Sequence, residues 1–244
     1  MSLPWWLEIF LGLGLGYLVG SWVESFMHEH VSDAHPRRVK AWMRAPRLLR
    51  PLINTHYSHH TIHHVRTFRA GHTTQFRSEE ERSQLTEVLL ARGRHGRIII
   101  AGAFGTRLHG SGALVFVAPL VIFFPFFWWG LGPAGFVASC FTLLLSPFMS
   151  HFVHPWLHRP FEQGQTEAPA WLAWLLRTRY MRAVYRNHFL HHRYGGVSNF
   201  NLVLGADILR GRARAITSRD LEVMAELGMP LPDSARPGVQ QAHG

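Results

Sequence analysis

Residues 112–150 read GALVFVAPLVIFFPFFWWGLGPAGFVASCFTLLLSPFMS and contain no Asp, Glu, Lys or Arg. This uncharged stretch is roughly twice as long as the ~20 apolar residues with which one helix crosses a bilayer. The segment WWGLGPAG (128–135) interrupts it near its middle with glycines and a proline. We therefore predict a transmembrane hairpin whose limbs span about residues 112–130 and 133–150.

A second apolar stretch, PWWLEIFLGLGLGYLVGSWV, covers residues 4–23 and carries a single charge, that of Glu8. It has neither the basic start nor the small-residue cleavage site of a secretory signal, so we predict a retained membrane span. Gly12, Gly16 and Gly20 recur every four residues. This spacing favours close packing of the span against another helix.

The basic residues predict the orientation of these spans. All 25 Lys and Arg residues lie within 24–111 or 151–244, and by the positive-inside rule both regions face the cytoplasm. The apolar run in residues 97–110 is too short for a further crossing, and we expect it to be interfacial or re-entrant. The fold class is therefore all-α: an integral-membrane helical bundle of three to four spans with a cytoplasmic helical cap. The net charge of +10 fits anionic lipid headgroups, and without a matching motif it does not indicate nucleic acid.

We expect a single membrane-embedded domain over residues 1–228. Residues 229–244, MPLPDSARPGVQQAHG, have the Pro, Gly and polar composition of a disordered tail. The stretch APAWLAWLL (168–176) predicts an interfacial helix with its tryptophans at headgroup depth. The only cysteine, Cys140, excludes an intrachain disulfide and a CxxC metal site.

Histidine is the most unusual feature of the composition, with 18 residues and none within the predicted spans. Ten of them form four groups with ligand-like spacing near the cytoplasmic span ends. The groups are His30 and His35; His56, His59 and His60; His154 and His158; and His188, His191 and His192. On an α-helix, residues three and four apart share a face, so HxxHH directs three imidazoles to one place. A tetrahedral zinc ion needs four ligands, and ten are enough for two metal ions with five ligands each.

Neighbouring residues extend this predicted di-metal site. Four more histidines adjoin the groups as candidate ligands or hydrogen-bond partners: His28, His63, His64 and His151. His28 is an alternative to His30, because MHEHVSDAH contains both. Metal-bound histidines usually donate their second ring N–H to a polar group. The candidates for that role are Glu29, Asp33, Asn187, Asn199, Asn201 and Asp207, although helix capping and turns explain the asparagines and Asp207 equally well.

These four boxes resemble those of the fatty acid hydroxylase/sterol desaturase superfamily, which are integral-membrane, non-haem di-iron enzymes. The resemblance covers residues 20–210, and SNFNLVLGADILRG (198–211) is similar to a segment of the bacterial members. It implies that the ten box histidines hold two iron ions as Fe²⁺, and that O₂ is the co-substrate. Imidazole also accepts zinc, so a recombinant sample could carry zinc instead.

The resemblance implies a membrane-bound, O₂-dependent lipid hydroxylase that inserts oxygen into a C–H bond of a fatty acyl, sterol-like or related lipid. It implies no catalytic residues beyond the metal ligands. The chain has no flavin, haem or iron–sulfur motif of its own, so we expect an external electron donor: a ferredoxin, a rubredoxin or a small haem protein with its reductase. The expected location is a bacterial inner membrane, with the boxes and the C-terminus in the cytoplasm. The sequence does not indicate the oligomeric state.

Two alternatives stay open. A membrane lipid desaturase shares the di-iron chemistry and the HxxxxH and HxxHH boxes, and some carotenoid ring hydroxylases have similar boxes. The short chain and the additional pair HPWLH (154–158) favour the hydroxylase. The other alternative is a histidine-rich metal-binding or metal-transport membrane protein. A transporter is expected to carry ligands near the bilayer midplane, whereas Glu8 is the only charged residue in the predicted spans.

Overall fold

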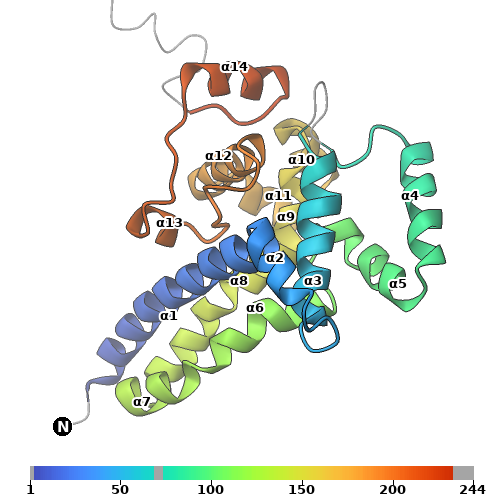
Figure 1. The fold of residues 1–244 in the computed structure, drawn as a ribbon. Helices are drawn as coiled ribbons and strands as arrows, with labels where there is room; N and C mark the ends of the chain where they lie inside the picture. The colour runs from blue at the N-terminus through green and yellow to red at the C-terminus, as the bar shows by residue number, and fades with distance from the viewer. Residues whose placement is uncertain (1–2, 69–73, 233–244) are drawn as a thin grey trace, which may run out of the picture.

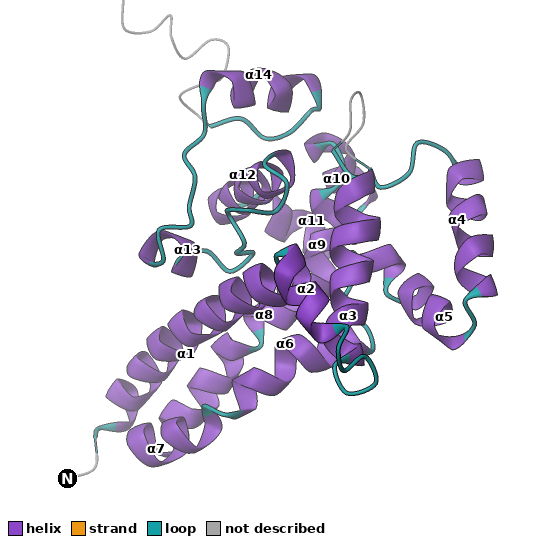
Figure 2. Cartoon of the chain, in the orientation of Figure 1, coloured by secondary structure: helices purple, strands orange, loops and turns teal. Residues whose placement is uncertain are grey.

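The computed structural model describes residues 3–68 and 74–232. Within these ranges the chain consists of helices and loops without a β-strand (Figure 2), which confirms the all-α prediction. The α-helices in chain order are α1 (Trp5–Met27), α2 (Pro36–Trp42), α3 (Arg50–His56), α4 (Glu79–Ala91), α5 (Arg94–Ala101), α6 (Ser111–Val121), α7 (Phe124–Leu143), α8 (Leu145–Phe148), α9 (His154–Leu157), α10 (Phe161–Glu167), α11 (Ala170–Leu176), α12 (Arg179–Arg193), α13 (Ala206–Leu209) and α14 (Ser218–Glu226).

The most apolar helices, α1, α6 and α7, lie together at one end of the molecule, beside the N-terminus (Figure 1). Helix α1 packs along α7 through the glycines of its four-residue repeat, all of which are buried. A Cβ atom at Gly16 would lie 2.3 Å from Thr142 Oγ1 and 2.6 Å from the carbonyl oxygen of Ser139. The absence of a side chain therefore lets the two helix backbones approach closely, as the spacing predicts.

The uncharged stretch folds differently from two straight limbs. Helix α6 ends at Val121, and α7 changes direction at Gly132, whose φ of 78° lies within the predicted interruption. Among the described residues, the helical stretches long and apolar enough to cross a membrane are Trp5–Ser32 and Phe124–Leu157. The predicted limb 112–130 is divided between α6 and the first turns of α7, so it does not form one continuous spanning helix.

The other two apolar segments form short helices. Residues 97–110 contribute to α5 and to a 3₁₀ turn at Ala103–Gly105. Helix α11 accounts for the predicted interfacial segment, and it has an apolar exposed side as well as a buried one. Trp171 and Trp174 are 51% and 72% exposed, while Leu172 is buried.

The remaining core lies at the opposite end of the molecule from the N-terminus (Figure 1). It is centred on α12, where Tyr185 and Phe189 are fully buried against α9, α11 and α14. The hydroxyl of Thr178 caps α12 by accepting a hydrogen bond from the Met181 N–H. Met229 is also buried in this core, so the tail predicted over 229–244 begins later than expected. Residues 233–244 of that tail lie outside the described residues.

Three π-helical segments interrupt the α-helical pattern: η1 (His28–Ser32), η2 (Tyr57–His64) and η4 (Met149–Val153). The first two continue directly from α1 and α3, and the third continues from α8. A π-turn holds more residues than an α-turn, because its backbone hydrogen bonds join residues five apart, and such turns are frequent at functional sites. Each of these segments contains or borders a cluster of histidines, so they determine which imidazoles face the interior.

Candidate metal centre

Ten side chains form two buried groups in which each residue offers one ligand atom, and the five atoms of a group lie within 4.8 Å of one another. Group A consists of His28, Asp33, His59, His64 and His191. Group B consists of His63, His154, His158, His188 and His192. Both groups draw on residues from separate parts of the chain, so the fold assembles them.

Group B is formed from two regular helical repeats and one residue of η2. His154 begins α9 and His158 directly follows its end, while His188 and His192 lie within α12; the members of each pair are four residues apart and share a helix face. The Nε2 atom of His154 lies 3.1 Å from that of His188 and 3.1 Å from that of His158. The ring of His63 completes the group, with its centroid 4.5 Å from that of His158 and 4.7 Å from that of His192.

Group A depends on π-helical spacing. Asp33 follows His28 by five residues, and His64 follows His59 by five. The Nε2 atom of His59 lies 2.9 Å from that of His28 and 3.1 Å from that of His64. The fifth ligand, His191, lies with its Nε2 3.1 Å from that of His64. Asp33 Oδ2 is 3.3 Å from His28 Nε2 and 3.2 Å from His191 Nε2.

Hydrogen bonds at the other ring nitrogen orient several of these imidazoles. Each of three Nδ1 atoms lies against a backbone carbonyl oxygen. His28 bonds to Phe200 at 2.6 Å, His191 to Ser198 at 2.7 Å, and His154 to Thr106 at 2.8 Å. A carbonyl oxygen only accepts, so Nδ1 carries the proton and the Nε2 lone pair faces the group.

This arrangement fits a metal ion in each group. Nε2 lone pairs directed at one another without protons repel, and a cation at the centre would satisfy them. The nitrogen atoms of His63 and the Nε2 atom of His192 are buried without a hydrogen-bond partner. This is unfavourable for polar atoms unless a bound ion or molecule contacts them. Imidazole nitrogen together with one carboxylate is a donor set that suits iron, copper or zinc.

Burial also favours the charge state that binds metal. It lowers the pKa of His63, His64, His158, His188 and His192 well below the ordinary histidine value, and neighbouring histidines act in the same direction. The four of these imidazoles that belong to group B are therefore neutral at pH 7, with lone pairs available. Burial alone would raise the pKa of Asp33, but the surrounding imidazoles, led by His64 and His59, hold it well below its usual range. Group A therefore contains a carboxylate anion.

The structure brings six of the ten predicted ligands into these groups: His59, His154, His158, His188, His191 and His192. The other four, His30, His35, His56 and His60, lie outside both. His35 caps α2 by accepting a hydrogen bond from the Arg37 N–H, and the ring of His30 packs against Phe26. The reason is the wider turn of the π-helical segments. In η2 it directs His63 and His64 inward, four and five residues after His59, and at the end of η1 it directs Asp33 inward, five residues after His28.

His56 and His60 nevertheless lie close to group A. Their rings stack with centroids 5.0 Å apart, and the Nδ1 atom of His56 bonds to the carbonyl oxygen of Ser32. His60 Nδ1 bonds to Asp33 Oδ1 at 2.9 Å, and the His60 side chain is 42% exposed. His60 therefore supports a ligand from the solvent side and does not itself belong to the group.

The residues predicted to adjoin the boxes have varied positions. Three of the four adjoining histidines, His28, His63 and His64, belong to the groups, whereas His151 bonds to the carbonyl oxygen of Leu108. Asp33 is predicted to lie beside the ligands, and in the structure it belongs to group A itself. The spacing HxxxHH at 59–64 and the five-residue step from His28 to Asp33 are the signals that indicate this set.

Five of the polar residues expected to bond to the ligand imidazoles bond to other parts of the chain instead. Glu29 pairs with Arg210 and Arg212. Four others form their hydrogen bonds within the loop that follows α12, with one another and with α1: Asn187, Asn199, Asn201 and Asp207.

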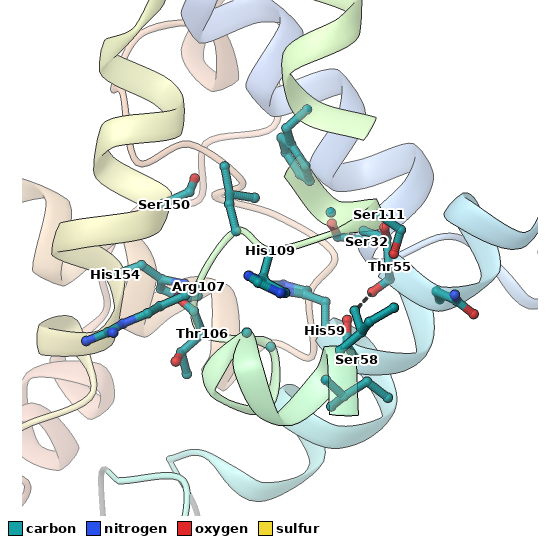
Figure 3. A pocket seen from close by; sticks show the side chains of 18 of the residues that line it. Ser32, Thr55, Ser58, His59, Thr106, Arg107, His109, Ser111, Ser150 and His154 are labelled. Carbon is teal, nitrogen blue, oxygen red and sulfur yellow. Dashed lines mark hydrogen bonds between the residues drawn. The ribbon is translucent and has the colours of Figure 1, made fainter. Parts of the chain in front are cut away.

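A cavity of about 60 Å³ lies against both groups. His28 and His59 of group A and His154 of group B line it, and Figure 3 shows His59 and His154 among its walls. Apolar side chains such as Phe116 and Leu202 share the lining with the polar ones. A more open cleft of about 740 Å³ reaches the centre from another side, through Asp33 and His60.

Compared with models of known protein families, with curated proteins and with solved structures, the chain matches none. The geometry of the two groups is therefore the evidence that they could hold metal ions.

Proposed function

We propose that this chain is a membrane-bound, O₂-dependent lipid hydroxylase whose cofactor is a pair of iron ions, one in group A and one in group B. The observation that carries the proposal is the pair of buried five-ligand groups. They adjoin at His64 and His192, whose rings stack 4.1 Å apart. Two adjacent metal ions with nine imidazoles and one carboxylate are more than a single structural zinc site requires.

The choice of iron rests on the resemblance of the histidine boxes to those of the fatty acid hydroxylase/sterol desaturase superfamily. When bound there, the two iron ions supply the reduction of O₂ and the removal of hydrogen from an unactivated C–H bond. Hydroxylation places one oxygen atom in the lipid and releases the other as water, which consumes two electrons and two protons. An external carrier such as a ferredoxin, a rubredoxin or a small haem protein supplies the electrons.

The residues of the chain bind, orient and shield this centre. Burial holds the imidazoles of His63, His158, His188 and His192 in the neutral state, and backbone carbonyls at the Nδ1 atoms of His28, His154 and His191 fix the orientation of those rings. The small cavity against both groups gives a substrate carbon access to the two sites and leaves little room for bulk water. Phe116 on α6 contributes to its wall, so the cavity lies beside the apolar end of the molecule, from which a lipid would enter.

The membrane placement follows from the same helices. We propose that α1 and the part of the stretch Phe124–Leu157 that follows Gly132 cross the bilayer, and that α6 with the turns of α7 before Gly132 makes a third crossing. By the positive-inside rule, the distribution of Lys and Arg favours the cytoplasmic side for the proposed metal centre and the C-terminus, and we propose that the membrane is a bacterial inner membrane.

A desaturase is the second candidate, because the same centre can remove two hydrogens instead of inserting oxygen. A transporter is less consistent with the site. His28 directly follows the end of α1, and His154 lies near the end of the stretch Phe124–Leu157, away from a bilayer midplane where a transported ion would be bound.

Two experiments test the proposal. Elemental analysis of protein purified from membranes should find about two metal ions per chain. His191→Ala should lower this number, and His35→Ala, outside both groups, should leave it unchanged. An unchanged metal content in His191→Ala would contradict the site. Lipid analysis of cells with and without the gene then separates the reactions: a gain of one oxygen indicates hydroxylation, and a loss of two hydrogens indicates desaturation.

A further inference from the structure

One loop, residues 198–207, holds two ligands of group A. The carbonyl oxygen of Ser198 accepts a hydrogen bond from His191 Nδ1, and that of Phe200 accepts one from His28 Nδ1. These ligands belong to α12 and η1, so a single short loop reaches two sides of the group. Its two carbonyls select the tautomer in which each Nε2 atom is free to bind metal.

A reciprocal pair of hydrogen bonds closes the loop on itself, and two further hydrogen bonds fasten this pair to α1. The Asn201 N–H donates to Asp207 Oδ2 at 2.7 Å, and the Asp207 N–H donates to Asn201 Oδ1 at 2.9 Å. From this pair, Asn201 Nδ2 donates to the carbonyl oxygen of Ser21, and Ser25 Oγ donates to Asp207 Oδ1. Asn201 and Asp207 are only 1% and 3% exposed. The helix held in this way is the one that leads into His28.

The loop is fastened to α12 by one amide. Asn187 Nδ2 donates to the carbonyl oxygens of Asn199 and Asn201, the residues on either side of Phe200. Asn187 precedes His191 by four residues, so both lie on the same face of α12. The carbonyl of Phe200 is therefore fixed relative to the two helices whose ligands the loop contacts.

Group B is oriented by other parts of the chain. His154 bonds to the carbonyl oxygen of Thr106, and His192 Nδ1 lies 3.2 Å from Thr67 Oγ1. We propose that Asn201 and Asp207 are positioning residues for group A alone: through the carbonyls of Ser198 and Phe200 they set the direction and tautomer of His191 and His28. This inference rests on the metal binding in the proposed function.

Cobalt(II) binding to the full-length, metal-stripped protein in detergent tests this inference, because Co²⁺ binds imidazole and its visible absorption reports each occupied site. The wild type should bind two ions. Asn201→Ala and Asp207→Asn should keep one site unchanged and weaken the other about 10- to 100-fold, the usual effect of losing a group that orients a ligand. Asp220→Asn is the matched control. Asp220 is fully buried and bonds to Arg193, Tyr194 and Thr217, but it contacts no part of the loop, so both sites should remain.

The outcomes separate the two proposals. A wild type that binds no Co²⁺ contradicts the proposed metal centre itself. The positioning role alone is overturned if the wild type binds two ions and both variants bind two ions equally tightly. It is also overturned if a variant keeps its helical circular dichroism but loses both sites in parallel. If neither variant folds, Ser25→Ala decides, since it removes a single hydroxyl, which donates to Asp207 and accepts from Arg210. A weakened single site supports the role, and two unchanged sites refute it.

Discussion

His64 and His192 stack almost parallel, with ring centroids 4.1 Å apart and an interplanar angle of 15°, although they belong to different ligand groups. His64 belongs to η2 and offers its nitrogen to group A, whereas His192 belongs to α12 and offers its nitrogen to group B. The end of η2 therefore lies directly against the end of α12. Metal ions held in the two groups would be neighbours, with the stacked rings of His64 and His192 joining the two groups.

The π-helical register of η2 predicts which histidines of NTHYSHHTIHH (54–64) bind metal. His63→Ala should lower the metal content, because His63 is fully buried in group B. His56→Ala should leave it unchanged, because His56 lies outside both groups. Elemental analysis of the two purified variants checks this directly. A loss of metal in His56→Ala and not in His63→Ala would indicate an α-helical register and would refute the arrangement described above.

The glycines after α12 provide a second test of the centre. Gly195 and Gly196 both have positive φ, so an alanine at either position should destabilise the fold by about 1–2 kcal/mol. A Cβ atom at Gly196 would lie 2.8 Å from Asp33 Oδ1, whereas one at Gly195 would meet nothing within 4 Å. Gly196→Ala should therefore also reduce metal binding in group A. Equal metal content in the two variants would show that Asp33 is free to move aside.

The contact between α1 and α7 predicts opposite effects at two glycines of the same helix. Gly16→Ala forces a methyl group against Thr142 and should destabilise the protein by about 1–3 kcal/mol. Gly14 faces open space, and Gly14→Ala should stabilise the helix by roughly 0.5–1 kcal/mol. Thermal unfolding in detergent measures both changes. A stabilised Gly16→Ala variant would show that the helices are farther apart than described.

The buried histidines predict that the metal-free protein is weakened by acid. Their folded-state pKa values are lowered, so below about pH 6.5 the unfolded chain takes up protons that the folded chain does not. Stability should then fall by up to about 1.4 kcal/mol per pH unit for each imidazole that stays neutral. Unfolding temperatures of the metal-stripped protein between pH 7.5 and 5.5 check this. A temperature that rises on acidification would contradict the neutral state of group B.

Sequence reasoning succeeds where the ligands lie on regular α-helix. In α12, His188, His191 and His192 follow the three- and four-residue rule, and all of them belong to the groups. His154 and His158 follow it as well. The rule fails in η1 and η2, because whether a helix widens to π depends on packing around it. No local sequence signal distinguishes His28, His63 and His64, which belong to the groups, from His30, His56 and His60, which do not.

The predicted hairpin shows a similar limit at the level of the fold. The absence of charge in 112–150 identifies apolar helices, and Gly132 lies in the predicted interruption. Composition alone does not show that the chain leaves the helix between α6 and α7, because the residues there are as apolar as their neighbours. The bonds between loop 198–207 and α1 join residues more than 170 positions apart, and no local pattern predicts such pairs.

The π-helical segment η2 makes the length of the chain, as well as its residues, part of the metal centre. Deleting one residue between His59 and His63 would let the backbone return to ordinary α-helix with about 3.6 residues per turn. His63 and His64 would then follow His59 by three and four residues instead of four and five, although neither had been replaced. A single-codon deletion here should therefore abolish metal binding as completely as the loss of several ligands. The spacing between the boxes is thus a constraint that substitutions alone would not reveal.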